Sequence, residues 1–349
     1  MTVLADAIKK VATGPHLSKD LTQDEAYAAM TEILSGKADP VQAAIFFIAL
    51  RIKRETDAEN KGILQAMQAV TEQVTVDIKQ LLTLSDPYNG YNRHQPIVAF
   101  LPAVLAASGL PTLSQGVWEM GPKFGVTHAQ VLAEAGIATG CSTSQVAQQI
   151  SQTDCAWAYS DQSQASPRLY ALQDLRTRMI KRPSLATLEK LMMPIKAQRN
   201  YLQIGFVHKE YPAILASVAD YAGFDLALIV RGIEGSIVPT LREASNCFIG
   251  SKGEAISLPI DPTEFDIQQT TRGVLPQQDQ PVSASQTVEL GLQTLSGQTG
   301  AAHDSLVLAG AMALWQYGVQ TSPQQAADVI RHSFKSGKAK AYFEQGIKA

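Results

Sequence analysis

The sequence contains few cysteines, and their positions form no recognisable pattern. Cys141, Cys155 and Cys247 are an odd number of widely separated residues without a Cys-x-x-Cys pair. This spacing argues against a disulfide framework or a zinc site, and it favours a reducing compartment such as the cytoplasm. The chain also lacks a secretory apolar segment and any apolar run of about 18 residues. We therefore expect no membrane span and no membrane partner.

An excess of positive charge is also missing. Charged residues make up 17% of the chain, apolar residues make up 45%, and the formal net charge is −3. This composition is typical of an ordinary globular protein. Because no overall positive charge indicates a nucleic-acid binder, any such function must depend on a local cluster of basic residues.

Residues 1–75 are predicted to be helical, with three short helices joined by tight turns. Each helix begins with residues that cap a helix N-terminus: Thr22 with Glu25, Asp39 before Pro40, and Thr56 with Glu59. Gly36 ends the first of these helices. The second helix carries the nearly all-apolar run 41–50, so we expect it to be buried.

The rest of the chain alternates between strand-like and helix-like apolar runs. The predicted strands are Leu81–Leu84, Leu110–Leu113, Leu202–Val207 and Leu226–Val230. The predicted helices are Ile97–Ala107, Ala129–Ala135, Tyr211–Ala222 and His303–Trp315. Such alternation indicates parallel βαβ units, and Asp261–Ser285 is expected to be a surface loop. The fold class is therefore α/β, with a small N-terminal helical domain and a larger α/β domain around a mainly parallel central sheet.

Glycine is scarce at the one junction where a phosphate site would need it. Residues 85–93 read Ser-Asp-Pro-Tyr-Asn-Gly-Tyr-Asn-Arg and lie between a predicted strand and a predicted helix. Phosphate loops bind through bare backbone N–H groups, but here Gly90 is the only glycine and Pro87 has no N–H. Two interpretations remain open: a plain Asn-Gly turn, or a remodelled ligand loop formed by Tyr88, Asn89 and Gly90.

Four short segments, in this order and spacing, resemble the anthranilate phosphoribosyltransferase family, which has the glycosyltransferase family 3 fold. They are residues 49–56, 107–110, 258–262 and 336–339. The resemblance covers essentially the whole chain. It implies a helical domain of residues 1–75, joined in space by about 166–197, and an α/β domain of residues 76–165 and 198–349. It also implies a homodimer made through the helical domain.

The chain departs from this family at the sites that hold the phosphoribosyl donor. The family's Gly-Thr-Gly-Gly-Asp-Gly turn corresponds to the region ending in Asn89-Gly90, and its Lys-His-Gly-Asn-Arg segment keeps only Gly116. The acidic pair that would hold magnesium is reduced to Glu234, while Arg176 matches an arginine of the aromatic-acid pocket. Because each lost phosphate donor typically costs about 3 kcal/mol, we expect ordinary anthranilate transfer to be lost. The resemblance identifies no catalytic residue.

A basic segment follows in the middle of the chain. Residues 168–199 contain eight positive residues and two negative ones. Spacing of i, i+3 and i+4 predicts that Arg178, Lys181 and Arg182 share one helical face. The candidate nucleic-acid-binding residues are Arg168, Arg176, Arg178, Lys181, Arg182 and Lys190. An ordinary solvated helix face is the alternative interpretation.

Two functions remain open from the sequence. The first is a homodimer that binds single-stranded DNA or RNA, with Tyr88, Tyr91 or Trp118 as stacking faces. A divergent branch of the family with a Tyr-Asn-Gly loop resembles this chain, and some members are thought to bind nucleic acid. The second is a divergent magnesium-dependent pentosyl transferase, acting on another aromatic acceptor, with Glu234 at the metal and Arg176 at the acceptor. A structural protein with a vestigial cleft is a third possibility, and the histidines are expected to be capping or surface residues.

Overall fold

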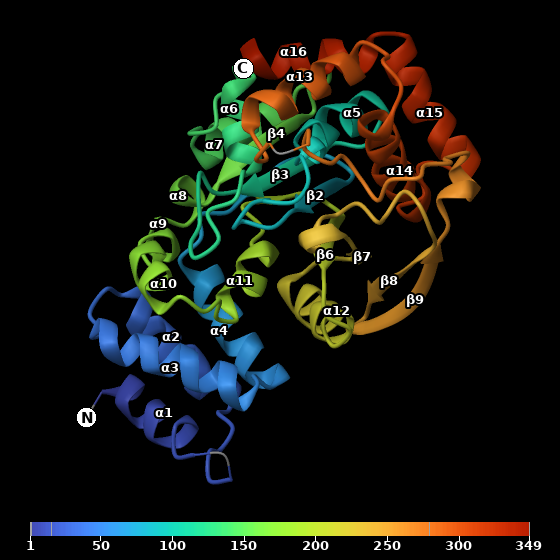
Figure 1. The fold of residues 1–349 in the computed structure, drawn as a ribbon. Helices are drawn as coiled ribbons and strands as arrows, with labels where there is room; N and C mark the ends of the chain where they lie inside the picture. Colours follow the sequence, from blue (N-terminus) through green and yellow to red (C-terminus); the bar gives the residue numbers. More distant parts are fainter. Residues whose placement is uncertain (1, 15, 279, 349) are drawn as a thin grey trace.

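The computed structural model describes residues 2–14, 16–278 and 280–348, which form a small helical domain beside a larger α/β domain (Figure 1). The N-terminal helices are α1 (Val3–Val11), α2 (Gln23–Leu34), α3 (Pro40–Lys53) and α4 (Asp57–Ala69). The three predicted helices are confirmed, and α1 is an additional one. Thr22 and Thr56 each form a complete capping box, and the Asp39 side chain caps α3. Among the described residues, none of the helices combines the length and apolar character needed to cross a bilayer.

A seven-stranded sheet forms the centre of the described α/β domain. Its strands are β2 (Leu81–Ser85), β3 (Thr112–Gly116), β4 (Trp157–Asp161), β6 (Asn200–Phe206), β7 (Leu226–Arg231), β8 (Ser245–Ser251) and β9 (Glu254–Ile260). Their order is β4-β3-β2-β6-β7-β8-β9. The first five strands in this order are parallel, and the β8–β9 hairpin continues the sheet antiparallel. The sequence correctly predicts a mainly parallel sheet, but it misses β4 and the hairpin.

Helices cover the sheet; the four predicted helical runs are confirmed, and several further helices are not predicted from the sequence. They are η1 (Ile97–Phe100), α5 (Leu101–Ala107), α6 (His128–Glu134), α7 (Thr143–Ile150), α12 (Tyr211–Ala222), α13 (Ala284–Leu295), α14 (Ala301–Gln316), α15 (Pro323–Lys335) and α16 (Lys338–Lys348). The predicted loop Asp261–Ser285 contains η4 (Pro262–Phe265) and the first two residues of α13; its residue 279 lies outside the described residues. Trp157 and Phe343 stack in the main core beneath these helices.

The chain returns to the helical domain between β4 and β6. This segment contains α8 (Gln162–Ala165), α9 (Pro167–Tyr170), α10 (Gln173–Met179), α11 (Leu185–Leu188) and η2 (Glu189–Leu191). Leu169, Leu185 and Leu188 are fully buried in the same apolar core as side chains of α2 to α4. Strands β1 (Val74–Thr75) and β5 (Ile195–Lys196) pair in parallel at the crossing between the domains. The segment thereby forms one wall of a cleft, and the carboxyl ends of β2, β6 and β7 face it.

Candidate functional site: a cationic cleft

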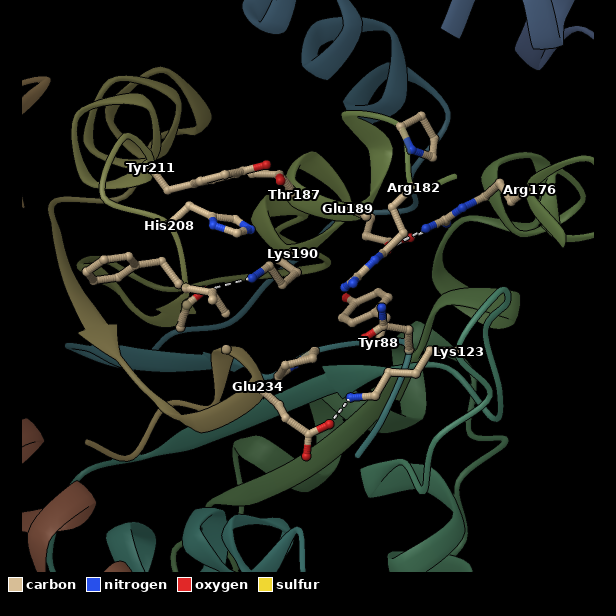
Figure 2. Close-up of a pocket in the computed structure, with 18 of the residues that line it drawn as sticks. Tyr88, Lys123, Arg176, Arg182, Thr187, Glu189, Lys190, His208, Tyr211 and Glu234 are labelled. Atoms are coloured by element: carbon tan, nitrogen blue, oxygen red, sulfur yellow. Dashed lines mark hydrogen bonds and ion pairs between the residues drawn. The ribbon is translucent and has the colours of Figure 1, made fainter. Parts of the chain in front are cut away.

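The cleft has a volume of about 590 Å³, which lies in the usual range for small-molecule sites. Its helical wall comes mainly from α3 and residues 182–190, and its other wall comes from the loops after β2, β3, β6 and β7. Figure 2 shows side chains from both walls pointing into this space. The carboxyl ends of parallel strands are the usual place for ligands in open α/β sheets, so the position is that of a binding site.

Positive side chains outnumber negative ones in the cleft by six to two. The lining cations are Arg51, Arg93, Lys123, Arg176, Arg182 and Lys190, and the lining carboxylates are Glu189 and Glu234. Arg51, Arg93 and Arg182 are exposed. This excess of positive charge favours an anionic ligand over a neutral or cationic one.

The loop after β2 uses its own backbone donors internally. The Gly90 N–H donates to the Pro87 carbonyl at 3.0 Å, and the Tyr91 N–H donates to the Val126 carbonyl at 2.9 Å. A Cβ on Gly90 would lie 2.2 Å from the Gly125 carbonyl oxygen, so glycine is needed for this close packing. The local arrangement is that of a packed turn, in which Tyr88 and Asn89 line the cleft and Gly90 does not.

Glu234 accepts the next two backbone donors of the same loop. Its Oε2 lies 2.9 Å from the Arg93 N and its Oε1 lies 3.2 Å from the Asn92 N. Lys123 Nζ is 2.5 Å from Oε1, and His94 Nδ1 is 3.2 Å from Oε2 (Figure 2 shows the Lys123 contact). Burial acts to raise the pKa of the Glu234 carboxyl, but the hydrogen bonds from His94 and Lys123 outweigh it and lower the pKa to about 2.

A metal role for Glu234 stays a prediction. Its oxygens already have protein donors, so magnesium would have to displace Lys123 and at least part of the loop contact. Within residues 2–14, 16–278 and 280–348 no group of three or more His, Cys, Asp or Glu side chains is arranged to hold a metal ion.

A second buried carboxylate holds the base of the loop. The Asp86 side chain accepts the Ile237 N–H at 3.1 Å and the Tyr91 hydroxyl, and His128 Nε2 lies 2.7 Å from it. Burial opposes ionisation of Asp86, but the charge and contact of His128 keep the pKa of its carboxyl lowered. The expectation that His128 is a capping or surface residue is therefore wrong, because its side chain is buried against Asp86. His303 is buried too, whereas His208 is exposed and lines the cleft.

The two buried cations of the basic segment are bound to protein oxygens. Arg176 and Glu189 form a bidentate pair at 2.5 and 2.8 Å, and both side chains are at most 2% exposed. Lys190 Nζ donates to the Gly205 carbonyl at 3.0 Å. Burial lowers the pKa of Lys190 to about 8, although Asp86 and Glu189 act in the opposite direction. Arg176 is thus neutralised inside the protein, so a role in holding an acceptor would require it to leave Glu189.

The other residues of the basic segment do not form one helical face. Helix α10 ends at Met179, and Ile180 adopts a left-handed conformation with φ 63°, so the helical face predicted from spacing is wrong. Arg182 lines the cleft, whereas Arg168, Arg178 and Lys181 do not. Arg178 instead pairs with Asp174 on the exposed side of α10 at 2.9 Å.

Three cleft cations lie outside the predicted basic segment: Arg51, Arg93 and Lys123. Arg51 belongs to one of the four family-like segments, which was the available signal for it. Lys123 lies in the loop after β3, where an isolated lysine between glycines gave no pattern. Gly116, predicted beside the ligand, is instead buried at the end of β3. A Cβ atom placed on Gly116 would lie 3.0 Å from the Tyr159 hydroxyl.

The aromatic side chains also differ from the prediction. Tyr88 and Tyr91 are 5% and 1% exposed, so neither ring can stack on a base. Trp118 is 48% exposed and remains available. Tyr211, the first residue of α12, and His208 line the cleft itself, and their rings lie 6.2 Å apart (Figure 2).

Two family models match this chain. Residues 5–70 match the helical bundle domain of a glycosyl transferase family, and residues 96–340 match the α/β domain of a glycosyl transferase family. The anthranilate phosphoribosyltransferase of Aromatoleum aromaticum is 25% identical, with 94% of each chain covered. An uncharacterized protein of Aquifex aeolicus is 29% identical over 68% of this chain and 71% of its own length.

Solved structures share the whole fold. Anthranilate phosphoribosyltransferase from Thermus thermophilus superposes with a TM-score of 0.81 at 19% identity, covering 100% of this chain and 99% of its own. The Saccharomyces cerevisiae enzyme in complex with PRPP and Mg superposes with a TM-score of 0.78 at 15% identity, covering 99% and 97%. At this level of identity the likeness establishes the fold alone.

Proposed function

This chain belongs to the glycosyl transferase family built from a helical bundle domain and an α/β domain, and we propose that its cleft binds the phosphate backbone of single-stranded nucleic acid. Ordinary anthranilate transfer is not part of this proposal, because the loop after β2 keeps its N–H groups for internal partners.

The observation that carries the proposal is the set of exposed arginines around the cleft. Arg51, Arg93 and Arg182 line it, and within the described residues no carboxylate lies within ion-pair distance of any of the three. Arg51 donates a hydrogen bond to the carbonyl of Arg182, which joins α3 to the helical segment. Exposed arginines that form no direct ion pair are suited to phosphate contacts, because binding there releases counterions from the nucleic acid.

Aromatic rings that line the same cleft as these arginines favour a single strand. Tyr211 and His208 line the same cleft, so a base could stack on a ring while its phosphates reach Arg93 and Arg182. Stacking on aromatic side chains together with basic contacts to the backbone is the usual way in which proteins bind unpaired bases. A duplex offers no free base faces, so we expect weaker binding of duplex DNA.

We further propose a homodimer formed through the helical domain. On α3 the side chains of Val41, Ile45 and Ile52 are 65%, 43% and 78% exposed, and their spacing places them on one stripe. Light scattering coupled to gel filtration would test this: the wild type should have twice the mass of one chain, and Ile52→Lys should shift it toward the monomer. A monomeric wild type would contradict this proposal.

Fluorescence anisotropy of a labelled single-stranded oligonucleotide, at three salt concentrations, tests the binding function. We expect micromolar or tighter binding and a linear fall of log affinity with log salt that corresponds to about three phosphate contacts. Absence of binding at low salt would overturn the proposal.

The second candidate is a divergent phosphoribosyl transferase that acts on another aromatic acceptor. It is favoured by one observation, the similarity over nearly the whole chain to anthranilate phosphoribosyltransferases. Under this alternative Glu234 would hold magnesium and Arg176 would hold the acceptor. Calorimetric titration with phosphoribosyl pyrophosphate at millimolar concentration, with and without magnesium, decides it: magnesium-dependent heat supports the transferase, and its absence eliminates it.

A further inference from the structure

Four donors, three from the loop after β2 and one from the loop after β3, converge on the carboxylate of Glu234. The Asn92 and Arg93 N–H groups, Lys123 Nζ and His94 Nδ1 all lie within 3.2 Å of Glu234 oxygens. The Glu234 side chain is 7% exposed, so the contact is largely withdrawn from water. Consecutive backbone N–H groups combined with a lysine are the components of a phosphate-binding site in other proteins.

The charges around these donors would be unbalanced without Glu234. Burial lowers the pKa of the Lys123 ammonium, Glu234 acts to raise it, and the charges of Arg182 and Arg93 lower it further. Lys123 also donates to the Gly90 carbonyl at 2.5 Å, which fixes the ammonium beside the loop. Removing the carboxylate would therefore leave a fixed ammonium and two N–H groups facing the cleft with no anion.

We propose that Glu234 is a resident anion that occupies an oxyanion site formed by Asn92, Arg93, His94 and Lys123, and that a ligand phosphate group binds there only by displacing it. The site would take a phosphate or diphosphate group. It uses the backbone N–H of Arg93 and none of the three guanidinium groups of Arg51, Arg93 and Arg182, so it does not require the nucleic-acid function proposed above.

The side chain of Glu234 acts on this account as an autoinhibitory contact. Its backbone has φ 56°, a conformation that glycine adopts without strain. Glu234→Gly therefore removes the carboxylate at a position where the backbone accepts glycine, and Glu234→Gln removes the charge while keeping the shape.

Isothermal titration with inorganic pyrophosphate, without magnesium and at low ionic strength, tests the proposal. We expect both variants to bind pyrophosphate at least ten times more tightly than the wild type. Adding Lys123→Met to Glu234→Gln should return the affinity to the wild-type level. Glu243→Gln, which removes an exposed carboxylate paired with Arg242, should leave it unchanged.

Two results would overturn the inference. One is pyrophosphate affinity in Glu234→Gln and Glu234→Gly no higher than in the wild type, and the other is equal gain from Glu243→Gln. If both Glu234 variants are unfolded in chloride buffer, thermal denaturation in pyrophosphate decides instead. Refolding with a rise in Tm supports the site, and no effect of pyrophosphate contradicts it. A wild type that fails to bind oligonucleotides would not change either outcome.

Discussion

The cations on the floor of the cleft and those on its rim have different surroundings. On the floor, Lys123, Arg176 and Lys190 are largely buried, and each contacts a protein oxygen. On the rim, Arg93 and Arg182 are exposed, and no carboxylate in the described parts of the chain lies within ion-pair distance of either. In the wild type the floor cations are therefore paired with protein oxygens, whereas the rim arginines are free of ion pairs with described residues and available to a ligand.

This difference shows that a count of basic residues does not define a binding surface. Arg176 contributes to the basic segment in the sequence, but Glu189 cancels its charge inside the fold. Arg178 is exposed but pairs with Asp174 away from the cleft. Whether a basic residue is available to a ligand depends on whether the protein itself supplies its counterion.

The largest effect is expected for a floor cation. Arg176→Met should lower the free energy of unfolding by about 3–5 kcal/mol, because Glu189 would remain buried without its partner. Urea denaturation followed by circular dichroism measures the loss. Arg176→Met/Glu189→Leu should recover most of it, since no unpaired charge is then left. A fully stable Arg176→Met protein would show that this pair is not structural.

A smaller effect is expected for the aromatic side of the cleft. Tyr211→Ala should weaken oligonucleotide binding by about tenfold, because stacking of one base contributes about 1–3 kcal/mol. Tyr211→Phe keeps the ring and should bind as the wild type does. Anisotropy titrations of both variants check this, and equal affinities in alanine and phenylalanine variants would exclude stacking on Tyr211.

The smallest effect is expected from the titration of Lys190. Its pKa of about 8, lowered by burial, means that the ammonium loses its proton as the pH rises through 8. The cleft then has one positive charge fewer, so oligonucleotide affinity should fall about threefold between pH 7 and pH 9. Lys190→Met should bind more weakly at pH 7 and lose this step. If the affinity of Lys190→Met also falls about threefold between pH 7 and pH 9, the fall must come from the titration of another group.

Local chemistry made much of the fold predictable from the sequence. Capping boxes at Thr22 and Thr56 locate two helix starts, and the apolar run Tyr211–Ala222 coincides with α12. Strand β4 was missed because Trp157–Asp161 is a short run with polar residues at its end.

The candidate site was only partly predictable, because its contacts join distant parts of the chain. Glu234 meets Asn92 across 142 residues, and no spacing rule connects the two. Burial of Tyr88 and Tyr91 depends on packing against other segments. The residue types alone therefore indicate rings available for stacking, which the fold buries. The end of α10 at Met179 is set by the left-handed Ile180, which periodicity does not reveal.

The most direct test of the account compares charge reversal on the rim with charge reversal outside the cleft. Anisotropy titrations of a single-stranded oligonucleotide should show at least a tenfold loss of affinity and a shallower salt dependence for Arg93→Glu/Arg182→Glu. Arg168→Glu/Arg178→Glu changes the net charge equally and should bind within about twofold of the wild type. Equal losses in the two double variants would contradict the cleft as the binding site.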